Sequence, residues 1–480
     1  MKRRVVIVGA GFGGIGAAIE LRAHGYTDVT ILDAAPGIGG TWLANTYPGA
    51  ACDVPSHLYS YSYAQRRDWS RLCSPQSEIL EYLRNVAHEH GVDDLVVPDT
   101  RVTRCTWTDD HWDVDADDGR RWSADVLVVA TGQLHDPVVP RIPGVEDFAG
   151  HTFHSARWDH DHDLTGRHVA VIGTGASAVQ FVPEIAPVVG RLSVFQRSGN
   201  WFLPRRNRPY PRAARAAIRR IPGLQRLRRG FLEKVYLEAI TGMIRHPATL
   251  GRVGTLYSTL FMRGQLRDPE TRRKAWPDYT FGCKRVLFSS HYLPALERGN
   301  VELVTDAVTG IEPAGVRTAD GRLHEVDTIV WGTGFATTKF MFPMAIVGRD
   351  GRSLEQEWAD GPHAHLGMTV PGFPSLFVLY GPNTNTSGGS IIVYLEAQVA
   401  YVRQALEELD RRDATALEVR RDVEEAFDAE LQSHFAGTAW LRCDSWYRDD
   451  TGRIVTNWPD YMRDYVRRTR ELDPAEFDFA

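Results

Sequence analysis

The chain has 480 residues, of which 43% are hydrophobic and 24% are charged. This composition is typical of a soluble globular protein, and the length exceeds what one hydrophobic core usually serves, so two or three domains are expected. The formal net charge of -6 gives no reason to expect nucleic acid or another polyanion as a partner.

The first residues are a few basic ones followed directly by a buried-strand pattern, so no signal peptide is expected. No continuous apolar run is long enough to span a bilayer. The widely spaced cysteines include no CxxC pair, and they are expected to be reduced thiols of a cytoplasmic protein, forming neither a zinc site nor a redox pair. They are Cys52, Cys73, Cys105, Cys283 and Cys443.

A glycine turn between a buried strand and an amphipathic helix opens the chain, in the stretch "VVIVGAGFGGIGAAIELRAHG" that begins at Val5. Its glycines fit the motif G-x-G-x-x-G, which allows a tight turn, close approach of a pyrophosphate and packing of helix on strand. The next strand, Val29–Leu32, ends at Asp33, whose carboxylate is placed to accept hydrogen bonds from a ribose hydroxyl. The residues predicted to form this dinucleotide site are Gly9, Gly11, Phe12, Gly13, Gly14 and Asp33.

The same pattern recurs in "RHVAVIGTGASAVQFVPEIA", as G-x-G-x-x-A after another apolar strand. Asp33 lies 24 positions after Gly9, and Arg197 lies 24 positions after Gly173. An acid at that place repels a 2'-phosphate, whereas a guanidinium pairs with it, so the first site is expected to hold FAD and the second NADP. The residues predicted for the second site are Gly173, Thr174, Gly175, Ala176, Ser177, Ala178, Arg197 and Ser198.

Two further strands repeat each other: "DVLVVATGQ" from Asp125 and "DTIVWGTGF" from Asp327. Together with the two glycine loops they predict an α/β fold with two Rossmann-like dinucleotide-binding domains, for FAD and NADP, and a helical insertion. The predicted division is an FAD-binding segment over 1–150, an NADP-binding segment over 151–210, a helical insertion or lid over 211–276, a second NADP-binding segment over 277–338, and a second FAD-binding segment with a C-terminal lid over 339–480.

The helical insertion begins inside a run of ten arginines between Arg205 and Arg229. Charged and apolar positions alternate there in "AIRRIPGLQRLRRGFLEKVY". Such a basic amphipathic surface could contact a membrane or an anionic ligand, although a solvated helix face is the commoner explanation. Both interpretations, a contact surface and a solvated helix face, stay open.

Two long signatures carry a family resemblance. "FAGHTFHSARWD" fits F-x-G-x-x-x-H-x-x-x-W-[PD], and "GGTWLANTYPGAACD" fits [AG]-G-x-W-x-x-x-x-[FY]-P-[GM]-x-x-x-D. Through these motifs the chain resembles the type I Baeyer–Villiger monooxygenases over nearly its whole length. The flavoprotein disulfide reductases, which also hold two dinucleotides, need a closely spaced cysteine pair that this chain lacks. A metal site at His151, His154, His160 and His162 is a weaker alternative, because these histidines have no recognisable ligand spacing.

The resemblance implies an NADPH- and O2-dependent enzyme that converts an apolar ketone or aldehyde to an ester or lactone through a flavin peroxide. Arg285 would be the catalytic cation beside that peroxide, and Asp53 would hold it, with a structural salt bridge as the plainer reading. His154 would belong to a connection that moves with NADP, or be a structural histidine. The bulk of Trp201, Phe202 and Phe288 hints at an apolar ligand.

The resemblance also assigns cofactor contacts. For FAD they are Gly40, Thr41, Trp42, Asp53, Tyr59 and Val102; on the NADP side they are Lys284, Arg285, the lid residue Trp446 and Cys52, the last as a small packing group rather than a nucleophile.

Two other functions remain open. The same flavin chemistry can oxygenate sulfur or nitrogen when the peroxide is protonated. A different class is a flavin- and NADP-binding redox protein, or an oxidase, without productive oxygenation.

Overall fold

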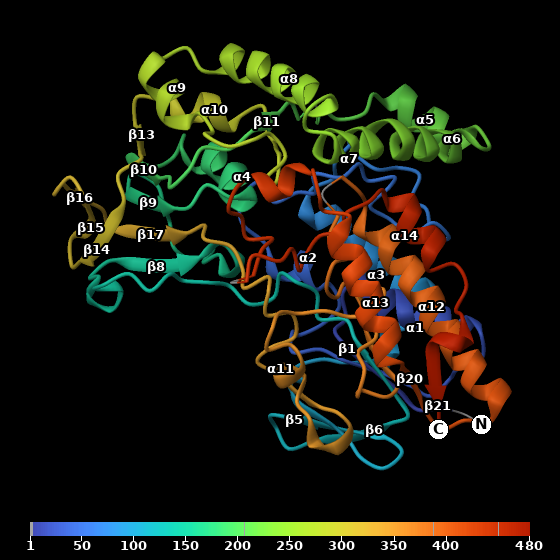
Figure 1. The fold of residues 1–480 in the computed structure, drawn as a ribbon. Helices are drawn as coiled ribbons and strands as arrows, with labels where there is room; N and C mark the ends of the chain where they lie inside the picture. Colours follow the sequence, from blue (N-terminus) through green and yellow to red (C-terminus); the bar gives the residue numbers. More distant parts are fainter. Residues whose placement is uncertain (1–2, 206, 387, 450) are drawn as a thin grey trace.

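The computed structural model describes residues 3–205, 207–386, 388–449 and 451–480. Arg206, one of the ten arginines noted above, lies outside the described residues. Two five-stranded parallel sheets form the centre of the fold, with helices packed around them (Figure 1). The α/β fold with two Rossmann-like units is therefore confirmed.

The first sheet has the strand order β19-β7-β1-β2-β3. Its central strands are apolar and buried on both faces, as expected of parallel strands that are covered by other layers on both sides. Its strands are β1 (Val5–Val8), β2 (Val29–Leu32), β3 (Val96–Val97), β7 (Val126–Val129) and β19 (Leu376–Val378). The helices packed near it are α1 (Phe12–Ala23), α2 (Thr41–Ala44), α3 (Gln76–Glu89) and α12 (Ile391–Arg412), with α13 (Arg421–Ser433) and α14 (Met462–Arg468) further out.

The second sheet has the order β13-β10-β9-β17-β8 and repeats the plan of the first. In both sheets the strand before the glycine loop lies between the strand that follows the loop's helix and one of the two "echo" strands, β7 and β17. Its elements are β8 (His151–His154), β9 (His168–Ile172), α4 (Ala176–Ile185), β10 (Arg191–Phe195), α10 (Tyr292–Leu296), β13 (Val301–Val304) and β17 (Thr328–Trp331).

The pairing of glycine loop and echo strand has a steric cause. Gly9 (φ +113°) and Gly173 (φ +108°) both adopt a backbone conformation that side chains rarely tolerate. A Cβ at Gly9 would stand 2.6 Å from the carbonyl oxygen of Ala130, and one at Gly173 would stand 2.4 Å from that of Gly332. The first glycine of each loop is thus required by the end of the neighbouring echo strand.

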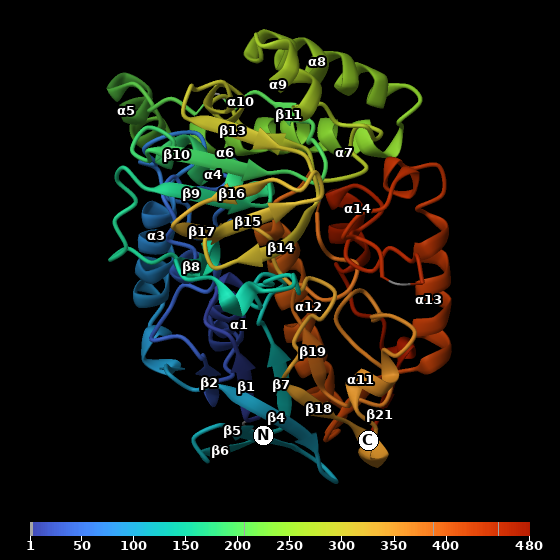
Figure 2. The same ribbon diagram turned by 90° about the vertical axis from the view of Figure 1, so that its left-hand side faces the viewer.

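Smaller sheets flank the two parallel ones (Figure 2). They are β18-β4-β5-β6 (Ala345–Val347, Val102–Trp107, Trp112–Ala116 and Arg121–Ala124), β14-β15-β16 (Val308–Glu312, Gly315–Thr318 and Leu323–Glu325), β11-β12 (Phe202–Leu203 and Leu287–Phe288) and β20-β21 (Leu417–Val419 and Phe477–Phe479). A short helix, α11 (Leu354–Glu357), follows β18.

The predicted insertion contains α5 (Arg212–Arg220), α6 (Leu224–Phe231), α7 (Glu238–Arg245), α8 (Leu250–Gln265) and α9 (Pro269–Ala275). Among the described residues, no helix combines the length and the apolar character needed to cross a membrane.

The chain crosses between the two sheets along two segments that lie side by side. The backbone N–H of Val138 donates to the carbonyl of Gly334 at 3.0 Å, and the N–H of Ala336 donates to the carbonyl of Asp136 at 3.0 Å. An isolated bridge also pairs Pro137 with Phe335. The outgoing and returning connections therefore form one two-stranded link.

The prediction that all five cysteines are reduced is wrong for two of them. Cys283 and Cys443 form a disulfide across 160 positions of sequence. The other three, Cys52, Cys73 and Cys105, are free and buried, and burial raises the pKa of each thiol. Spacing along the chain cannot reveal a pair that only tertiary folding brings together, and the expectation of a cytoplasmic protein loses the support it drew from reduced thiols.

Replacing Cys443 with serine is expected to lower the free energy of unfolding by about 2–4 kcal/mol, because the disulfide restricts the unfolded chain by closing a long loop. Guanidinium unfolding measures the change. The unmodified protein treated with a reductant should fall to the stability of C443S, whereas the reductant should leave C443S itself unchanged.

Thiol titration of the denatured protein provides an independent check. Without reductant, only the three free cysteines should react. Reaction of all five would contradict the disulfide.

Candidate active site

The first glycine loop is held in place by Asp33. Its Oδ2 accepts a hydrogen bond from the N–H of Ala10 at 2.5 Å, and its Oδ1 accepts one from the N–H of Ala35 at 2.8 Å. Burial raises the pKa of Asp33, and these two hydrogen bonds act against that rise. Each carboxylate oxygen keeps further lone pairs, so Asp33 can support the loop and still accept from a ribose hydroxyl.

Unlike the first glycine, the second glycine of each loop is not required by packing within the protein. Gly175 begins α4 with φ −73°, and the nearest protein atom to a Cβ built there, the carbonyl oxygen of Gly332, is 3.9 Å away. At Gly11, which begins α1, the nearest atom is 3.6 Å away. A side chain would make only ordinary van der Waals contact with the protein at both positions, in front of a helix N-terminus, where a pyrophosphate would fit.

Residues of the second signature pack on the first loop. A Cβ at Gly40 (φ +52°) would stand 2.9 Å from the Cα of Gly11, and the indole N–H of Trp42 donates to the hydroxyl of Tyr59 at 3.1 Å. The ring of Tyr59 lies 5.4 Å from that of Phe12. Of the other predicted contacts, Thr41 is exposed at the start of α2, Val102 is buried at the start of β4, and the carbonyl of Cys52 accepts from Arg205 at 2.8 Å.

The predicted phosphate-binding residues come together beyond the second loop. The ammonium of Lys284 donates to the hydroxyl of Ser198 at 3.2 Å and lies 4.7 Å from the centre of the Tyr279 ring. Burial and the nearby charge of Arg197 lower the pKa of Lys284. Two cations that repel each other beside a hydroxyl form a site in which an anion relieves the repulsion.

Arg285 and Asp53 form an ion pair across the two halves of the chain, with 3.4 Å between Nη2 and Oδ2. The Asp53 side chain is 11% exposed, whereas that of Arg285 is 48% exposed. Burial acts to lower the pKa of Arg285, but the charge of Asp53 and nearby tyrosines, Tyr447 and Tyr380, outweighs it and raises the pKa. The guanidinium of Arg285 is therefore permanently charged. Asp53 holds it on one side, and its other side is exposed.

Gln180 is a site residue that the sequence reasoning missed. It lies on α4, and its Oε1 accepts from the hydroxyl of Tyr47 at 3.1 Å and from the N–H of Ala51 at 3.1 Å. Its Nε2 donates to the carbonyl of Ala51 at 2.9 Å and lies 3.4 Å from Oδ1 of Asp53. The helix after the second loop is thereby fixed to the second signature, and no sequence pattern signalled this amide.

The C-terminal segment reaches the same region through the disulfide. Cys443 is bonded to Cys283, which directly precedes Lys284. Trp446 is 41% exposed, and its ring lies 4.2 Å from that of the buried Tyr447. Tyr447 and Tyr380, whose hydroxyl donates to Asn385 at 2.8 Å, are further neighbours of Arg285 that the sequence reasoning missed.

His154 lies away from this ion pair, at the end of β8. It is 6% exposed, its Nδ1 accepts from the N–H of Ala156 at 3.0 Å, and its ring lies 5.8 Å from that of Phe335 in the returning connection. Burial lowers its pKa, which favours the neutral imidazole. No contact joins it to Asp53 or Arg285 among the described residues, so the structure places it at the link between the sheets.

The other histidines of this stretch have ordinary partners. His151 pairs with Asp159 at 2.9 Å and stacks on His162, while His160 contacts the hydroxyl of Thr46 at 2.8 Å. In the described part of the chain no group of three or more histidine, cysteine or acidic side chains is arranged to hold a metal ion.

The large aromatic residues that hinted at an apolar ligand belong mainly to the core. Trp201 is 6% exposed and Phe202 is 1% exposed, both inside the core of the second sheet, and Phe288 packs against that core as well. These residues therefore do not mark a substrate pocket by themselves.

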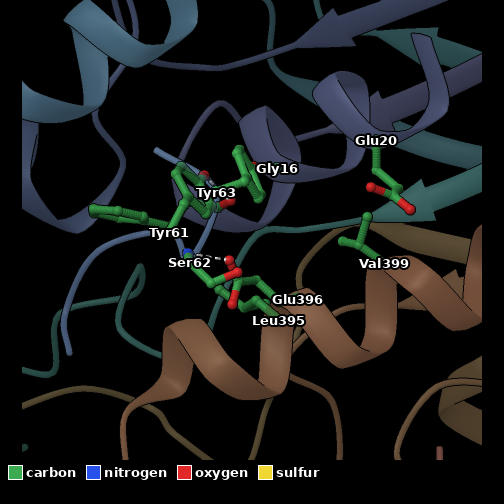
Figure 3. A pocket seen from close by; sticks show the side chains of 9 residues that line it. Gly16, Glu20, Tyr61, Ser62, Tyr63, Leu395, Glu396 and Val399 are labelled. Carbon is green, nitrogen blue, oxygen red and sulfur yellow. Dashed lines mark hydrogen bonds between the residues drawn. The ribbon is translucent and has the colours of Figure 1, made fainter. Parts of the chain in front are cut away.

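A separate cavity of about 200 Å³ lies between α1 and α12 (Figure 3). Its acidic groups already have partners: Glu396 accepts from the N–H of Ser62 at 2.6 Å, and Glu20 pairs with Arg403 at 2.9 Å. Of the predicted site residues only Phe12 lines it. We assign it no ligand.

The chain is similar to known proteins over its whole length. The family described as pyridine nucleotide-disulphide oxidoreductase matches residues 6–210. A Baeyer–Villiger monooxygenase of Streptomyces coelicolor is 42% identical over 479 residues, covering 99% of this chain and 92% of the relative. Among solved structures, an oxidized steroid monooxygenase bound to NADP is 31% identical with a TM-score of 0.88, and the OTEMO complex with FAD and NADP is 26% identical with a TM-score of 0.91; each covers at least 99% of both chains.

A full-length relative at this identity identifies the enzyme class. The chain belongs to the Baeyer–Villiger monooxygenase family of NADPH-dependent flavin monooxygenases.

Proposed function

We propose that this enzyme uses FAD, NADPH and O2 to convert an apolar ketone or aldehyde into an ester or lactone. The observation that carries the proposal is the open guanidinium of Arg285, held by Asp53 and adjacent in sequence to the Lys284 of the anion site. This arrangement supports the proposal, because a fixed positive charge beside the proposed NADPH site would stabilise negative charge that develops on a carbonyl compound.

The first glycine loop would hold FAD, with segments 1–150 and 339–480 forming its domain. The second loop would hold NADPH, with segments 151–210 and 277–338 forming its domain. Bound FAD, reduced by NADPH, supplies the activation of O2 and the delivery of one oxygen atom. The room left beside Gly11 and Gly175 supports both assignments.

Arg285 would stabilise the negative charge that develops on the carbonyl oxygen of the substrate when the carbonyl carbon is attacked. The charge is in place before the reaction begins, so little reorganisation is needed during it. Asp53 would orient the guanidinium of Arg285. Gln180 would hold the carboxylate of Asp53 beside α4. The proposed roles of His154 and Trp446 are positional, at the link between domains and on a lid over NADP.

Arg197, Ser198 and Lys284 would bind the 2'-phosphate of NADPH. The mutual repulsion of the two cations supports this assignment, because a phosphate between them removes it. Since Lys284 and Arg285 are consecutive, binding of the phosphate also fixes the backbone that carries the catalytic cation.

The function is tested with the FAD-loaded enzyme, NADPH, O2 and a panel of ketones and aldehydes, with matched sulfides and amines. We expect ester or lactone formed in proportion to the NADPH consumed. Sulfoxide or N-oxide as the only product would favour heteroatom oxygenation, and hydrogen peroxide as the only product would favour an oxidase.

Replacing Arg285 with alanine is expected to lower the rate of ester formation by roughly 100-fold or more, the usual scale for removing one preorganised charge-stabilising group. Anaerobic bleaching of the flavin by NADPH should be largely preserved, because that step does not use the carbonyl-facing charge. Unchanged ester formation by R285A would refute the role of Arg285.

Replacing Arg197 with alanine is expected to raise the KM for NADPH by about 10- to 100-fold, because charge-assisted hydrogen bonds contribute about 1.5–3 kcal/mol. The KM for NADH, which lacks the phosphate, should change little. Arg191, at the opposite end of β10 and paired with Glu302, provides the matched control. Equal effects of R197A on the two cofactors would contradict the assignment.

A further inference from the structure

The helical insertion exposes an unusual share of the chain's large apolar side chains. Of the fifteen exposed large hydrophobic residues in the described part of the chain, eight lie between positions 221 and 260. They are Ile221, Leu227, Phe231, Leu250, Val253, Leu256, Tyr257 and Leu260. Single exposed apolar residues are ordinary on a protein surface, but a cluster of this size marks an interaction site.

On α8 these residues form one continuous stripe. Val253, Leu256 and Leu260, spaced by three and four residues, are 59%, 60% and 60% exposed. The opposite face of the helix is buried through Gly251, Gly254, Ser258 and Met262, and a Cβ at Gly254 would stand 2.6 Å from the Phe281 ring. The helix thus packs on the protein mainly with small residues and Met262, and it presents the stripe of Val253, Leu256 and Leu260 outward.

The same segment carries a strong positive charge. Residues 211–267 contain twelve arginines and lysines but only two acidic residues, within a chain whose formal net charge is -6. Several of these arginines are exposed and have no ion-pair partner among the described residues. They are Arg212, Arg219, Arg220, Arg226, Arg252, Arg263 and Arg267.

Basic and apolar groups occupy one end of the molecule. In both ribbon views α5, α6, α7 and α8 lie at the end opposite to the two chain termini (Figures 1 and 2). Arg252 and Arg263 lie on α8 itself, beside the apolar stripe. A partner at this end therefore meets apolar side chains and arginines together.

We propose that this end of the enzyme docks on the surface of an anionic lipid bilayer, with α8 and the α5–α6 hairpin lying in the interface plane. An amphipathic surface of this kind inserts its leucine and aromatic side chains at the acyl boundary, while its arginines pair with anionic headgroups. Each basic residue near such a surface contributes about 1 kcal/mol of attraction.

Charge favours this partner over a second copy of the chain. A two-fold contact would place the same basic surface on both sides, and like charges across an interface are strongly unfavourable. Nucleic acid would satisfy the arginines, but it would leave the leucine stripe of α8 in water. A bilayer with anionic headgroups satisfies both groups of side chains.

Docking would also bring the membrane close to the catalytic loop, the segment 281–285 that carries Lys284 and Arg285. Gly282 packs against Ile244 of α7, and Phe281 packs against α8, directly before Lys284 and Arg285. An apolar substrate dissolved in the bilayer would then enter beside the active site. This consequence rests on the proposed function, whereas the docking itself does not.

Flotation of the full-length, FAD-loaded protein with vesicles tests the proposal. Vesicles of phosphatidylcholine mixed with phosphatidylglycerol should carry the protein, vesicles of phosphatidylcholine alone should carry much less, and added salt should weaken the binding. The double variant L256S/L260S should lose about tenfold or more in binding at unchanged charge. V188S, at an apolar residue that is 50% exposed in the turn after α4, should bind normally.

Retained FAD and unchanged ketone oxidation in detergent-free buffer show that L256S/L260S is folded. Three results would overturn the proposal: absence of vesicle binding, binding to anionic vesicles that L256S/L260S leaves unaffected, or a dimer detected by sedimentation that the same substitutions dissolve. Failure of ester formation with normal vesicle binding would instead count against the proposed function alone.

Discussion

The ion pair between Asp53 and Arg285 is the contact on which the site depends. Asp53 follows the first glycine loop within the second signature, and Arg285 belongs to the half of the chain that carries the second loop. Their pairing, together with the contact of Gln180 from α4, joins the second signature to the half of the chain that carries the second loop. Because Lys284 precedes Arg285, the same short segment would serve the proposed anion site on one side and the proposed carbonyl-facing charge on the other.

Within each loop, the first and the second glycine are glycines for different reasons. Gly9 and Gly173 are required by the fold, because a side chain there would collide with the end of the adjacent echo strand. Gly11 and Gly175 have no such neighbour, so the room beside them is available to a ligand. One motif therefore combines a packing requirement with a binding requirement, which explains why the glycine loop and the echo strand recur together in both sheets.

Many of the strands, helices and loops were predictable because they depend on patterns within short stretches of sequence. The strands at Val5–Val8 and Val29–Leu32, the helix after each loop, and the break between α5 and α6 all follow from local patterns of apolar residues, glycine and proline. The grouping of Arg197, Ser198 and Lys284 was predicted from matched offsets and from the family resemblance, and the structure joins two of them through the hydrogen bond from Lys284 to Ser198.

The features that were missed depend on contacts between distant positions. Gln180 meets Ala51 across 129 residues, and Cys283 meets Cys443 across 160 residues. Neither leaves a periodic or spaced signal in the chain. The sequence also did not predict that the leucines of α8 face outward, because periodicity predicts two faces of a helix but not which of them the protein covers.

The disulfide limits how far the C-terminal segment can move. Trp446 lies three residues after Cys443, and three residues of fully extended chain span about 10 Å. Cys443 is bonded to Cys283, and Lys284 and Arg285 follow Cys283 directly. Whatever conformation the segment adopts, the backbone of Trp446 therefore stays within about 10 Å of its anchor beside the catalytic loop. The proposed NADP lid would therefore open without leaving the site, since the covalent bond keeps its local concentration high.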